Sequence, residues 1–153
     1  MKLIKNGELS EPAWIFCDNI DHDRHDVGQI LPYRVFLENR VRRTNTIGLV
    51  GIQIDVDTEL EDIIAYFDQL HLIVIEFASF VDGRGFSIAG RLRQSLNYAG
   101  EIWANGNLFA DQYPLAVQCG IDGVVVDEQL LQRQPVEHWR QAIDMHPAFR
   151  SLM

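Results

Sequence analysis

Residues 77–87 combine the residue types that bind an anion, in the order Phe-Ala-Ser-Phe-Val-Asp-Gly-Arg-Gly-Phe-Ser. Gly83 and Gly85 permit a tight turn with close approach of the backbone, and Arg84 carries a planar fork of hydrogen-bond donors. A helix is expected to follow this turn, and the free amides at its N-terminus favour negative charge. The stretch therefore predicts an oxyanion or phosphate site in which Arg84 is the clamp.

The same residues also support a purely structural interpretation. In this interpretation Asp82 caps the following helix, the two glycines form a turn, and Arg84 pairs with Asp82 or Asp111. The spacing matches neither a Walker loop nor the glycine pattern of dinucleotide-binding proteins, so the motif alone does not decide between the two. Both interpretations stay open on the sequence.

A second group of candidate residues lies in the acidic segment 18–26. His22 and His25 are three residues apart between carboxylates, a combination that first-row metals accept as ligands. No cysteine and no evident third ligand accompanies them, so we expect a mobile loop without a metal. Cys17 and Cys119 lie far apart and outside any CxxC motif, which predicts free thiols in a reducing compartment. Flavin, iron–sulfur and Ser-His-Asp signatures are missing from the sequence, and we expect no cofactor.

Alternating strand and helix patterns are expected to position these residues. Runs rich in aliphatic and aromatic side chains predict strands at residues 14–17, 47–54, 72–75, 101–104 and 123–126. Helical spacing of apolar residues predicts helices at residues 58–70, 86–97, 111–119 and 135–145. Thr58 and Glu61 form a capping-box pattern at the start of the first of these helices.

The first part of the chain is less regular. Asn6-Gly7 is a strong hairpin signal within residues 1–9. Residues 18–28 read as a polar loop. Pro32 is expected to open a short helix, although a strand at residues 33–37 fits nearly as well.

Strands that alternate with helices require right-handed crossovers and a mostly parallel sheet. We therefore predict a single α/β domain over residues 1–153, built from βα units with helices on both faces of the sheet and a small N-terminal hairpin. Half of a β/α barrel is the alternative, because one sequence does not reveal the order of the strands.

In a parallel sheet, ligands bind beyond the carboxyl ends of the strands. The loops expected at that edge are residues 55–57, 77–85, 105–111 and 127–128. The candidate ligand-binding residues come from the second and third of these loops and are Asp82, Gly83, Arg84, Gly85, Asn105, Asn107 and Asp111.

The composition limits the classes of partner. The 153 residues carry a formal net charge of −9, a balance that repels nucleic acid and anionic lipid. Apolar runs are too short for a signal peptide or a bilayer span. Arg40, Arg42 and Arg43 form the only tight basic cluster and, without interleaved aromatics, indicate the solvated end of an element. We expect a soluble, cytoplasmic protein that binds neither nucleic acid nor membrane.

A longer pattern extends over residues 77–124. It consists of a Phe-rich stretch into Asp-Gly-Arg-Gly-Tyr/Phe-Ser, a Leu-Arg pair, Gly-Glu-Leu-Arg-Ala-x-Gly-Asp, an Asp-Gln pair and a closing Cys-Gly-Phe-Asp. The residues of this chain that match it are Phe77, Phe80, Asp82, Gly83, Arg84, Gly85, Phe86, Ser87, Leu92, Arg93, Gly100, Glu101, Ala104, Gly106, Asp111, Gln112, Cys119, Gly120 and Asp122. On these residues the chain resembles a family of uncharacterised bacterial proteins described as probable oxidoreductases involved in sulfite reduction.

Four positions depart from that family pattern. Ala78 stands in place of a proline, Trp103 and Gln118 in place of arginines, and Asn107 in place of an aspartate. The two lost positive charges would weaken an anion site built from all three arginines of the pattern.

The resemblance implies a role in assimilatory sulfite reduction. We expect an accessory or binding protein that holds an oxyanion or a redox partner at the carboxyl edge of the sheet. The implied partner is sulfite reductase or another sulfate-assimilation protein. A homodimer is a further possibility. The alternative is an oxidoreductase that acts on sulfite or a sulfur intermediate with an external electron donor.

Overall fold

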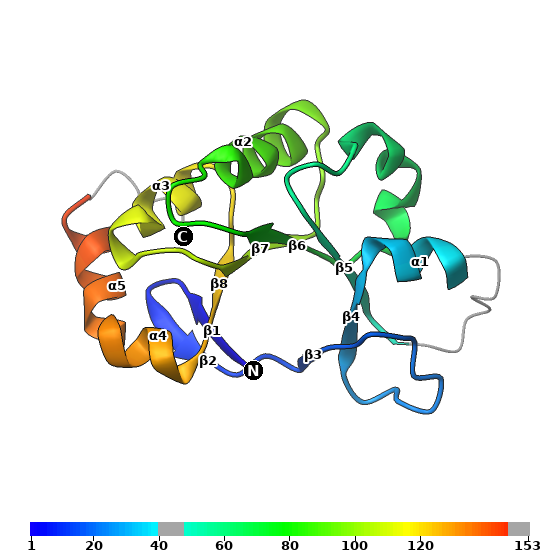
Figure 1. Ribbon diagram of the computed structural model, residues 1–153, viewed down its shortest axis with the longest axis horizontal. Helices are drawn as coiled ribbons and strands as arrows, with labels where there is room; N and C mark the ends of the chain where they lie inside the picture. The colour runs from blue at the N-terminus through cyan, green and yellow to red at the C-terminus, as the bar shows by residue number, and fades with distance from the viewer. Residues whose placement is uncertain (40–47, 147–153) are drawn as a thin grey trace.

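A computed structural model describes residues 1–39 and 48–146. Its eight strands form one sheet in the order β2-β1-β8-β7-β6-β5-β4-β3 (Figure 1). The strands are β1 Lys2–Lys5, β2 Glu8–Ser10, β3 Trp14–Phe16, β4 Gly28–Pro32, β5 Val50–Ile54, β6 Leu72–Phe77, β7 Glu101–Gly106 and β8 Gly123–Val126. The α-helices are α1 Tyr33–Asn39, α2 Arg84–Gly90, α3 Tyr113–Gln118, α4 Glu128–Arg133 and α5 Val136–Asp144. Shorter helical pieces are Leu60–Asp62, Ile64–Gln69 and Ala110–Gln112, all 3-10, and the π-helical turn Arg91–Ser95.

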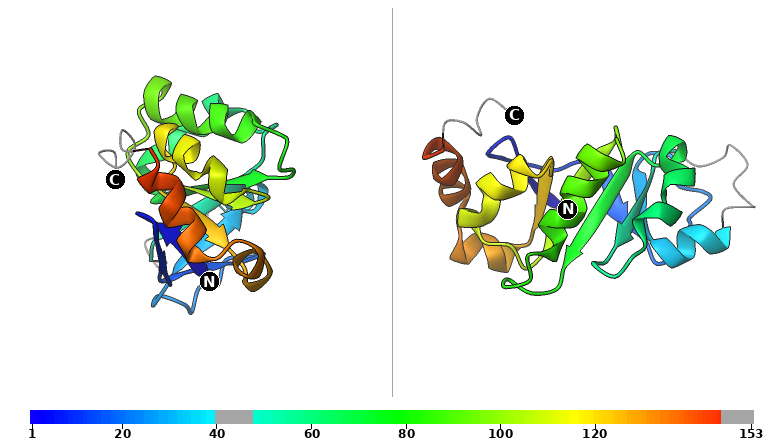
Figure 2. Two further views of the ribbon diagram at one scale, coloured as in Figure 1. Left: turned by 90° about the vertical axis from the view of Figure 1, so that its left-hand side faces the viewer. Right: turned by 90° about the horizontal axis from the view of Figure 1, so that it is seen from above.

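The sheet is a curled half-barrel. Strands β3 to β8 are parallel and lie side by side in chain order, and the hairpin of β1 and β2 joins β8 in antiparallel fashion. Right-handed crossovers between sequential neighbours place every connecting helix on the same face. The helices therefore cover the outer side of the curve, and the side view separates α2 from the N-terminal hairpin (Figures 1 and 2). The α/β class is confirmed, and of the two arrangements left open the half β/α barrel is the one formed.

Two hydrophobic cores lie on the two faces of the sheet. The outer core joins helix residues such as Phe36, Phe86 and Trp139 to the outward-facing side chains of the strands. The inner core is smaller and fills the concave side; it contains Leu3, Ile30, Leu72, Val74 and Trp103, with Trp14 and Val125 packed against it. The chain between β2 and β3 runs along this open side of the curve (Figure 1).

Local sequence signals account for several elements. Asn6 and Gly7 adopt φ of 54° and 76°, the left-handed turn that the predicted hairpin requires. The unbroken apolar run of β6 has both faces covered, because Leu72 and Val74 enter the inner core while Ile73 and Ile75 enter the outer core. The helix before Gly120 ends as predicted, and Gly120 has φ of 98°.

The predicted capping box at Thr58 is wrong. Thr58 Oγ1 donates to Asp55 Oδ1 at 3.0 Å and accepts from the Asp55 amide at 3.2 Å, so its hydroxyl belongs to the turn that leaves β5. The following segment begins after Glu59 without a side-chain cap and forms two 3-10 helices instead of one α-helix. Competition between a turn and a cap for one short polar side chain explains the difference.

Strand β4 and helix α4 were not predicted. β4 contains a polar residue, Gln29, and ends at Pro32, two features that argue against a strand. Gln29 is nevertheless buried, because its amide bonds the backbone N–H and C=O of Asp21 and the C=O of Arg24 at 2.7–3.1 Å. α4 begins after Asp127, whose carboxylate accepts the Leu130 amide at 2.7 Å as an N-cap.

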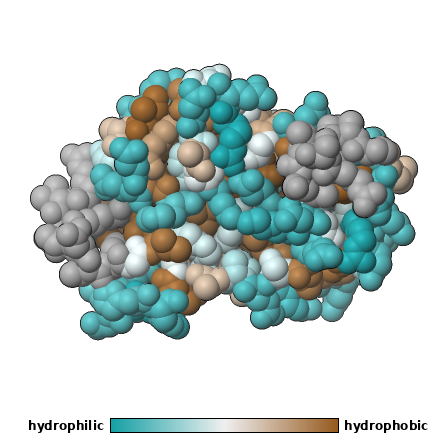
Figure 3. All heavy atoms as spheres, turned by 180° about the vertical axis from the view of Figure 1, so that it is seen from behind, coloured by the Kyte–Doolittle hydropathy of each residue, from teal (hydrophilic) through white to brown (hydrophobic). Residues whose placement is uncertain are grey.

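Some predictions fall on residues outside the described ranges. These are the cluster of Arg40, Arg42 and Arg43 and the first residue of the strand predicted to begin at Ile47. Within residues 1–39 and 48–146, the helices are too short and too polar to cross a membrane. The face opposite to that of Figure 1 shows hydrophilic side chains between small separate groups of apolar ones (Figure 3).

Candidate functional site

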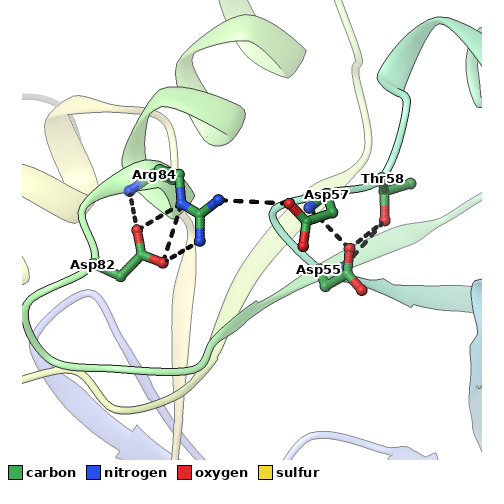
Figure 4. A network of polar contacts seen from close by, with 5 residues as sticks. All are labelled: Asp55, Asp57, Thr58, Asp82 and Arg84. Atoms are coloured by element: carbon green, nitrogen blue, oxygen red, sulfur yellow. Dashed lines mark hydrogen bonds and ion pairs between the residues drawn. The ribbon is translucent and has the colours of Figure 1, made fainter.

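The loop between β6 and α2, residues 78–83, is held by an ion pair at its end. Arg84 Nε lies 3.0 and 3.1 Å from the two carboxylate oxygens of Asp82, and Nη2 lies 2.8 Å from Oδ2 (Figure 4). The Asp82 carboxylate also accepts the Arg84 backbone amide at 3.1 Å. On the other side of the guanidinium, Nη1 lies 3.5 Å from Asp57. Arg84 therefore already faces two carboxylates.

The Asp57 carboxylate reaches Arg84 because the turn after β5 is fixed. Asp55 Oδ1 accepts the Asp57 amide at 2.9 Å and the Thr58 hydroxyl at 3.0 Å (Figure 4). The loops after β5 and β6 thus meet at the carboxyl edge of the sheet, as their parallel strands predict. The structural interpretation expected Arg84 to pair with Asp82 or Asp111. Arg84 does pair with Asp82, and its second partner is Asp57. Ligand binding by these residues stays a prediction.

The pKa of the Asp82 carboxyl lies below its ordinary value, because Arg84 donates hydrogen bonds to it from both its side chain and its backbone amide. A depressed pKa means that the pair stabilises the folded state above the ordinary pKa of aspartate and that this contribution is lost as the pH falls through the folded value. We expect Arg84→Ala to raise the Asp82 pKa, since the guanidinium bonds disappear. NMR titration of the carboxyl carbon in both proteins measures this, with Arg34→Ala as the control; an unchanged Asp82 pKa would contradict it.

Asn107, another predicted site residue, hydrogen-bonds the backbone where the β6–α2 loop begins. Its side-chain amide donates to the carbonyl oxygens of Ala78 at 2.8 Å and Phe77 at 3.4 Å. Gly106 precedes it with φ of 112°, and a Cβ there would lie 2.5 Å from the Phe77 carbonyl oxygen. This close approach explains the glycine and leaves Asn107 with a structural role.

The other predicted residues divide between separate places. Gly83 and Gly85 flank Arg84, and a Cβ on Gly85 would meet the Phe77 ring at 2.4 Å. Asp111 lies beside α5, where it lines a cavity with Gln134 and His138. The structure therefore brings Asp82, Gly83, Arg84 and Gly85 together but sets Asp111 apart from them.

The tip of the β6–α2 loop is apolar. Phe80 stacks on Phe109 of the loop after β7, with ring centroids 3.9 Å apart, and the Gln112 side chain donates to the Phe80 carbonyl at 3.2 Å. Next to this stack, Val81 is 93% exposed. The Val81 side chain is thus exposed to solvent between two anchored residues. Phe80 before it packs on Phe109, and Asp82 after it pairs with Arg84.

The concave side of the half-barrel opens at the same edge into a cavity of about 290 Å³, here called the mouth. Its lining residues are Phe16, Cys17, Asp18, Ile30, Pro32, Gln53 and Asn105. Asn105, predicted from its place near a strand end, donates from Nδ2 to Gln53 Oε1 at 3.1 Å. Gln53 was missed, although a single polar residue inside the apolar run of β5 is the signal that it gives.

The thiol of Cys17 at the mouth has a pKa raised by burial and by the nearby Asp21 carboxylate. The neutral thiol is therefore favoured, as expected for a free cysteine without an activating base. Within the described ranges, three or more His, Cys, Asp or Glu side chains do not gather as a metal site requires, and this includes His22 and His25.

Many residues of the longer sequence pattern lie at the opposite edge of the sheet, around Arg93. Its guanidinium donates to the carbonyl oxygens of Tyr98 at 2.8 Å, Gly100 at 2.7 Å and Gly120 at 3.2 Å. It also pairs with the Asp122 carboxylate at 2.6 Å. We call this the Arg93 buttress. It fastens the turns before β7 and β8 and gives these pattern residues a structural role.

Two of the departures from the pattern do not lie beside Arg84. Trp103 is buried in the inner core in the middle of β7. Gln118 lies at the end of α3, which runs back against the strands, and it lines a cavity with Arg93 at the amino edge. The expectation that arginines at these positions would join Arg84 in one anion site is therefore wrong, because the fold separates them.

Comparison with family models gives a match over residues 51–148 to the family described as "Bacterial protein of unknown function (DUF934)". The chain belongs to this family. The DUF934 match runs from β5 to α5 and includes the Arg93 buttress, the β6–α2 loop, Gln53 and Asn105. The hairpin, β3 and β4 lie before the DUF934 match. A comparison with curated proteins gave no match.

Proposed function

We propose that this DUF934 protein is an accessory protein of assimilatory sulfite reduction that binds a protein partner through its β6–α2 loop. The observation that carries the proposal is Val81, 93% exposed at the tip of a loop whose two sides are fixed. A preformed loop loses little conformational freedom on binding, so an exposed aliphatic side chain on it can contribute most of its burial energy to the complex. The pathway comes from the resemblance to the sulfite-reduction family.

The charges beside Val81 define the partner surface. Asp57 and Asp82 both pair with Arg84, which leaves one net negative charge in this group, and the whole chain carries a formal net charge of −9. A complementary surface has a small apolar pocket for Val81 with basic residues around it. Sulfite reductase is the partner that we propose first, because a role in sulfite reduction is what the sequence resemblance implies.

Binding to purified sulfite reductase from the same bacterium tests the proposal, with biolayer interferometry as the measurement. We expect the wild type to bind and Val81→Asp to weaken binding by at least about tenfold, which corresponds to about 1.4 kcal/mol. Ile64→Asp is the matched control, since Ile64 is also an exposed aliphatic residue but begins the 3-10 helix Ile64–Gln69 on the outer side of the sheet. Equal binding of wild type and Val81→Asp, or none by either, would overturn the proposal. A homodimer would be seen as self-association without the enzyme.

Oxyanion binding is the other role predicted for this edge, and the arrangement of Arg84 argues against it. Its guanidinium already faces Asp82 and Asp57, so a free anion would compete with two carboxylates for its charge. We expect millimolar sulfite to give no more thermal stabilisation than chloride at equal ionic strength. A sulfite-specific rise in melting temperature that Arg84→Ala removes would establish the anion site instead. The oxidoreductase alternative stays a prediction.

A further inference from the structure

We propose that the mouth of the half-barrel binds a small uncharged ligand that carries a carboxamide-like group on a flat apolar body. This inference does not depend on the partner proposed for the β6–α2 loop. The mouth lies where the carboxyl ends of the strands open from the inside of the curved sheet, the end at which β/α barrels place their ligands. Trp14 and Trp103 pack against each other in the inner core on the same concave side.

The apolar part of the lining consists of Phe16, Ile30 and Pro32. Ile30 is buried, whereas Phe16 is 42% exposed. An aromatic ring that borders a cavity offers a face on which a flat ligand can stack. A volume of about 290 Å³ accommodates one aromatic ring with a small substituent and is at the small end of ligand sites.

Beside Cys17 and Asp18, the polar lining of the mouth consists of two side-chain amides, those of Gln53 and Asn105. One hydrogen bond joins Asn105 Nδ2 to Gln53 Oε1 at 3.1 Å. No other side-chain hydrogen bond of these two residues is found in the described part of the chain. A primary amide has two donor hydrogens and a carbonyl acceptor, so the pair retains donors on Gln53 and an acceptor on Asn105. A ligand carboxamide has both complementary groups, a carbonyl oxygen and an NH2 on the same carbon, and can satisfy them together.

Acidic side chains outnumber basic ones around the mouth, where Asp18, Asp21 and Arg24 all act on the Cys17 thiol, and this excess disfavours an anion. Asp18 is the one charged side chain that lines the cavity within the described residues. Glu76 lies next to Asn105 in the register of β6 and β7 and is exposed. A carboxylate or oxyanion would meet these negative charges without a basic partner among the lining residues, which costs more than the amide bonds return. An uncharged ligand avoids this cost.

Benzamide and benzoate form a matched pair of probes for this proposal, because they have the same ring and differ in the uncharged amide against the carboxylate. Two-dimensional NMR of the side-chain amides of Gln53 and Asn105 reports binding directly. We expect benzamide to shift both signals in a saturable titration and benzoate to bind at least about tenfold more weakly, about 1.4 kcal/mol. Benzamide should also slow alkylation of Cys17 in a Cys119→Ser background.

Asn105→Leu removes the acceptor while keeping the size of the side chain, and it should abolish the benzamide titration. Its melting temperature verifies that the fold persists. Gln132→Leu, an exposed position on α4, is the control and should bind as the wild type does. The inference is wrong if benzamide does not shift the Gln53 and Asn105 signals, or if benzamide binds no more tightly than benzoate. Binding to sulfite reductase is measured separately, so either proposal can fail while the other stands.

Discussion

Arg93→Ala is expected to lower the free energy of unfolding by about 3 kcal/mol. The side chain of Arg93 is 25% exposed and donates to three backbone carbonyls and one carboxylate. Alanine leaves the carbonyl oxygens of Tyr98, Gly100 and Gly120 without this donor, and it leaves the Asp122 carboxylate half-buried without its cation. Charged hydrogen bonds of this kind contribute more than neutral ones, and the partial exposure keeps the loss below that of a fully buried pair.

Arg91→Ala is the matched control for Arg93→Ala. Arg91 lies two residues earlier in the same helical segment, and its partner is Glu61. Both of those side chains are more than half exposed, so the pair contributes about 0–1 kcal/mol. Urea denaturation followed by circular dichroism gives both values. Equal losses for the two variants would show that the Arg93 buttress is not a special support of the fold.

The effect of Arg93→Ala should also depend on pH. Burial raises the pKa of the Asp122 carboxyl, while the Ile102 amide and Arg93 act in the opposite direction. Without Arg93 the pKa of Asp122 rises further, and the folded state then favours the protonated acid. A raised carboxyl pKa gives stability at low pH that is lost as the pH rises through the folded value. The difference between the variant and the wild type is therefore expected to be largest near neutral pH and to shrink in acid.

The sequence predicted the parallel strands and the edge at which their loops meet, because both follow from local patterns and crossover handedness. It could not predict which loop residues touch. Arg84 and Asp57 are 27 positions apart, as are Arg93 and Gly120, and no local pattern marks either contact. The longer sequence pattern over residues 77–124 mixes two kinds of residue. Asp82 and Arg84 lie at the carboxyl edge, whereas Arg93 and its partners fasten the opposite edge.

The mouth shows the same limit. Asn105 was a candidate because it follows an apolar strand, but Gln53 of β5 and Cys17, just after β3, are far away in the chain. Their meeting depends on the curl of the sheet, which sequence periodicity does not encode. β4 was hidden for a related reason. Gln29 is buried only because its side-chain amide hydrogen-bonds the backbone of Asp21 and Arg24 in the preceding loop, a contact that the local sequence does not indicate.

Trp103→Ala is expected to cost about 3–5 kcal/mol, the range for truncating a fully buried tryptophan. Trp103 is 1% exposed, its ring meets Trp14 edge-on at 6.1 Å, and its indole N–H donates to Glu101 at 2.7 Å. It is the largest side chain of the inner core, and few neighbours are available to fill the space that alanine leaves. Trp103→Phe should cost less, because it keeps an aromatic ring against Trp14.

The loss should be local as well as global, because Trp14 anchors the chain that runs along the open side of the half-barrel. A Cβ on Gly28 would lie 2.4 Å from the Trp14 ring, so glycine at that position lets the ring lie flat on β4. With Trp103 gone, Trp14 keeps this contact but loses its edge-on partner, a pair that contributes about 0.5–1.5 kcal/mol beyond area burial. A double-mutant cycle with Trp14→Ala should return a coupling energy in that range.

Trp139→Ala separates the local effect from general destabilisation. Trp139 is equally buried but lies in the outer core on α5, away from the open side. Hydrogen exchange should therefore quicken at two amides that hold β3 to β4, Cys17 to the Ile30 carbonyl and Gly28 to the Ala13 carbonyl, in Trp103→Ala but not in Trp139→Ala. If both variants expose these amides to the same degree relative to their stability, the Trp14–Trp103 contact is not what fastens β3. If only Trp103→Ala does, the inner core supports the mouth, and the same variant should weaken benzamide binding without touching Gln53 or Asn105.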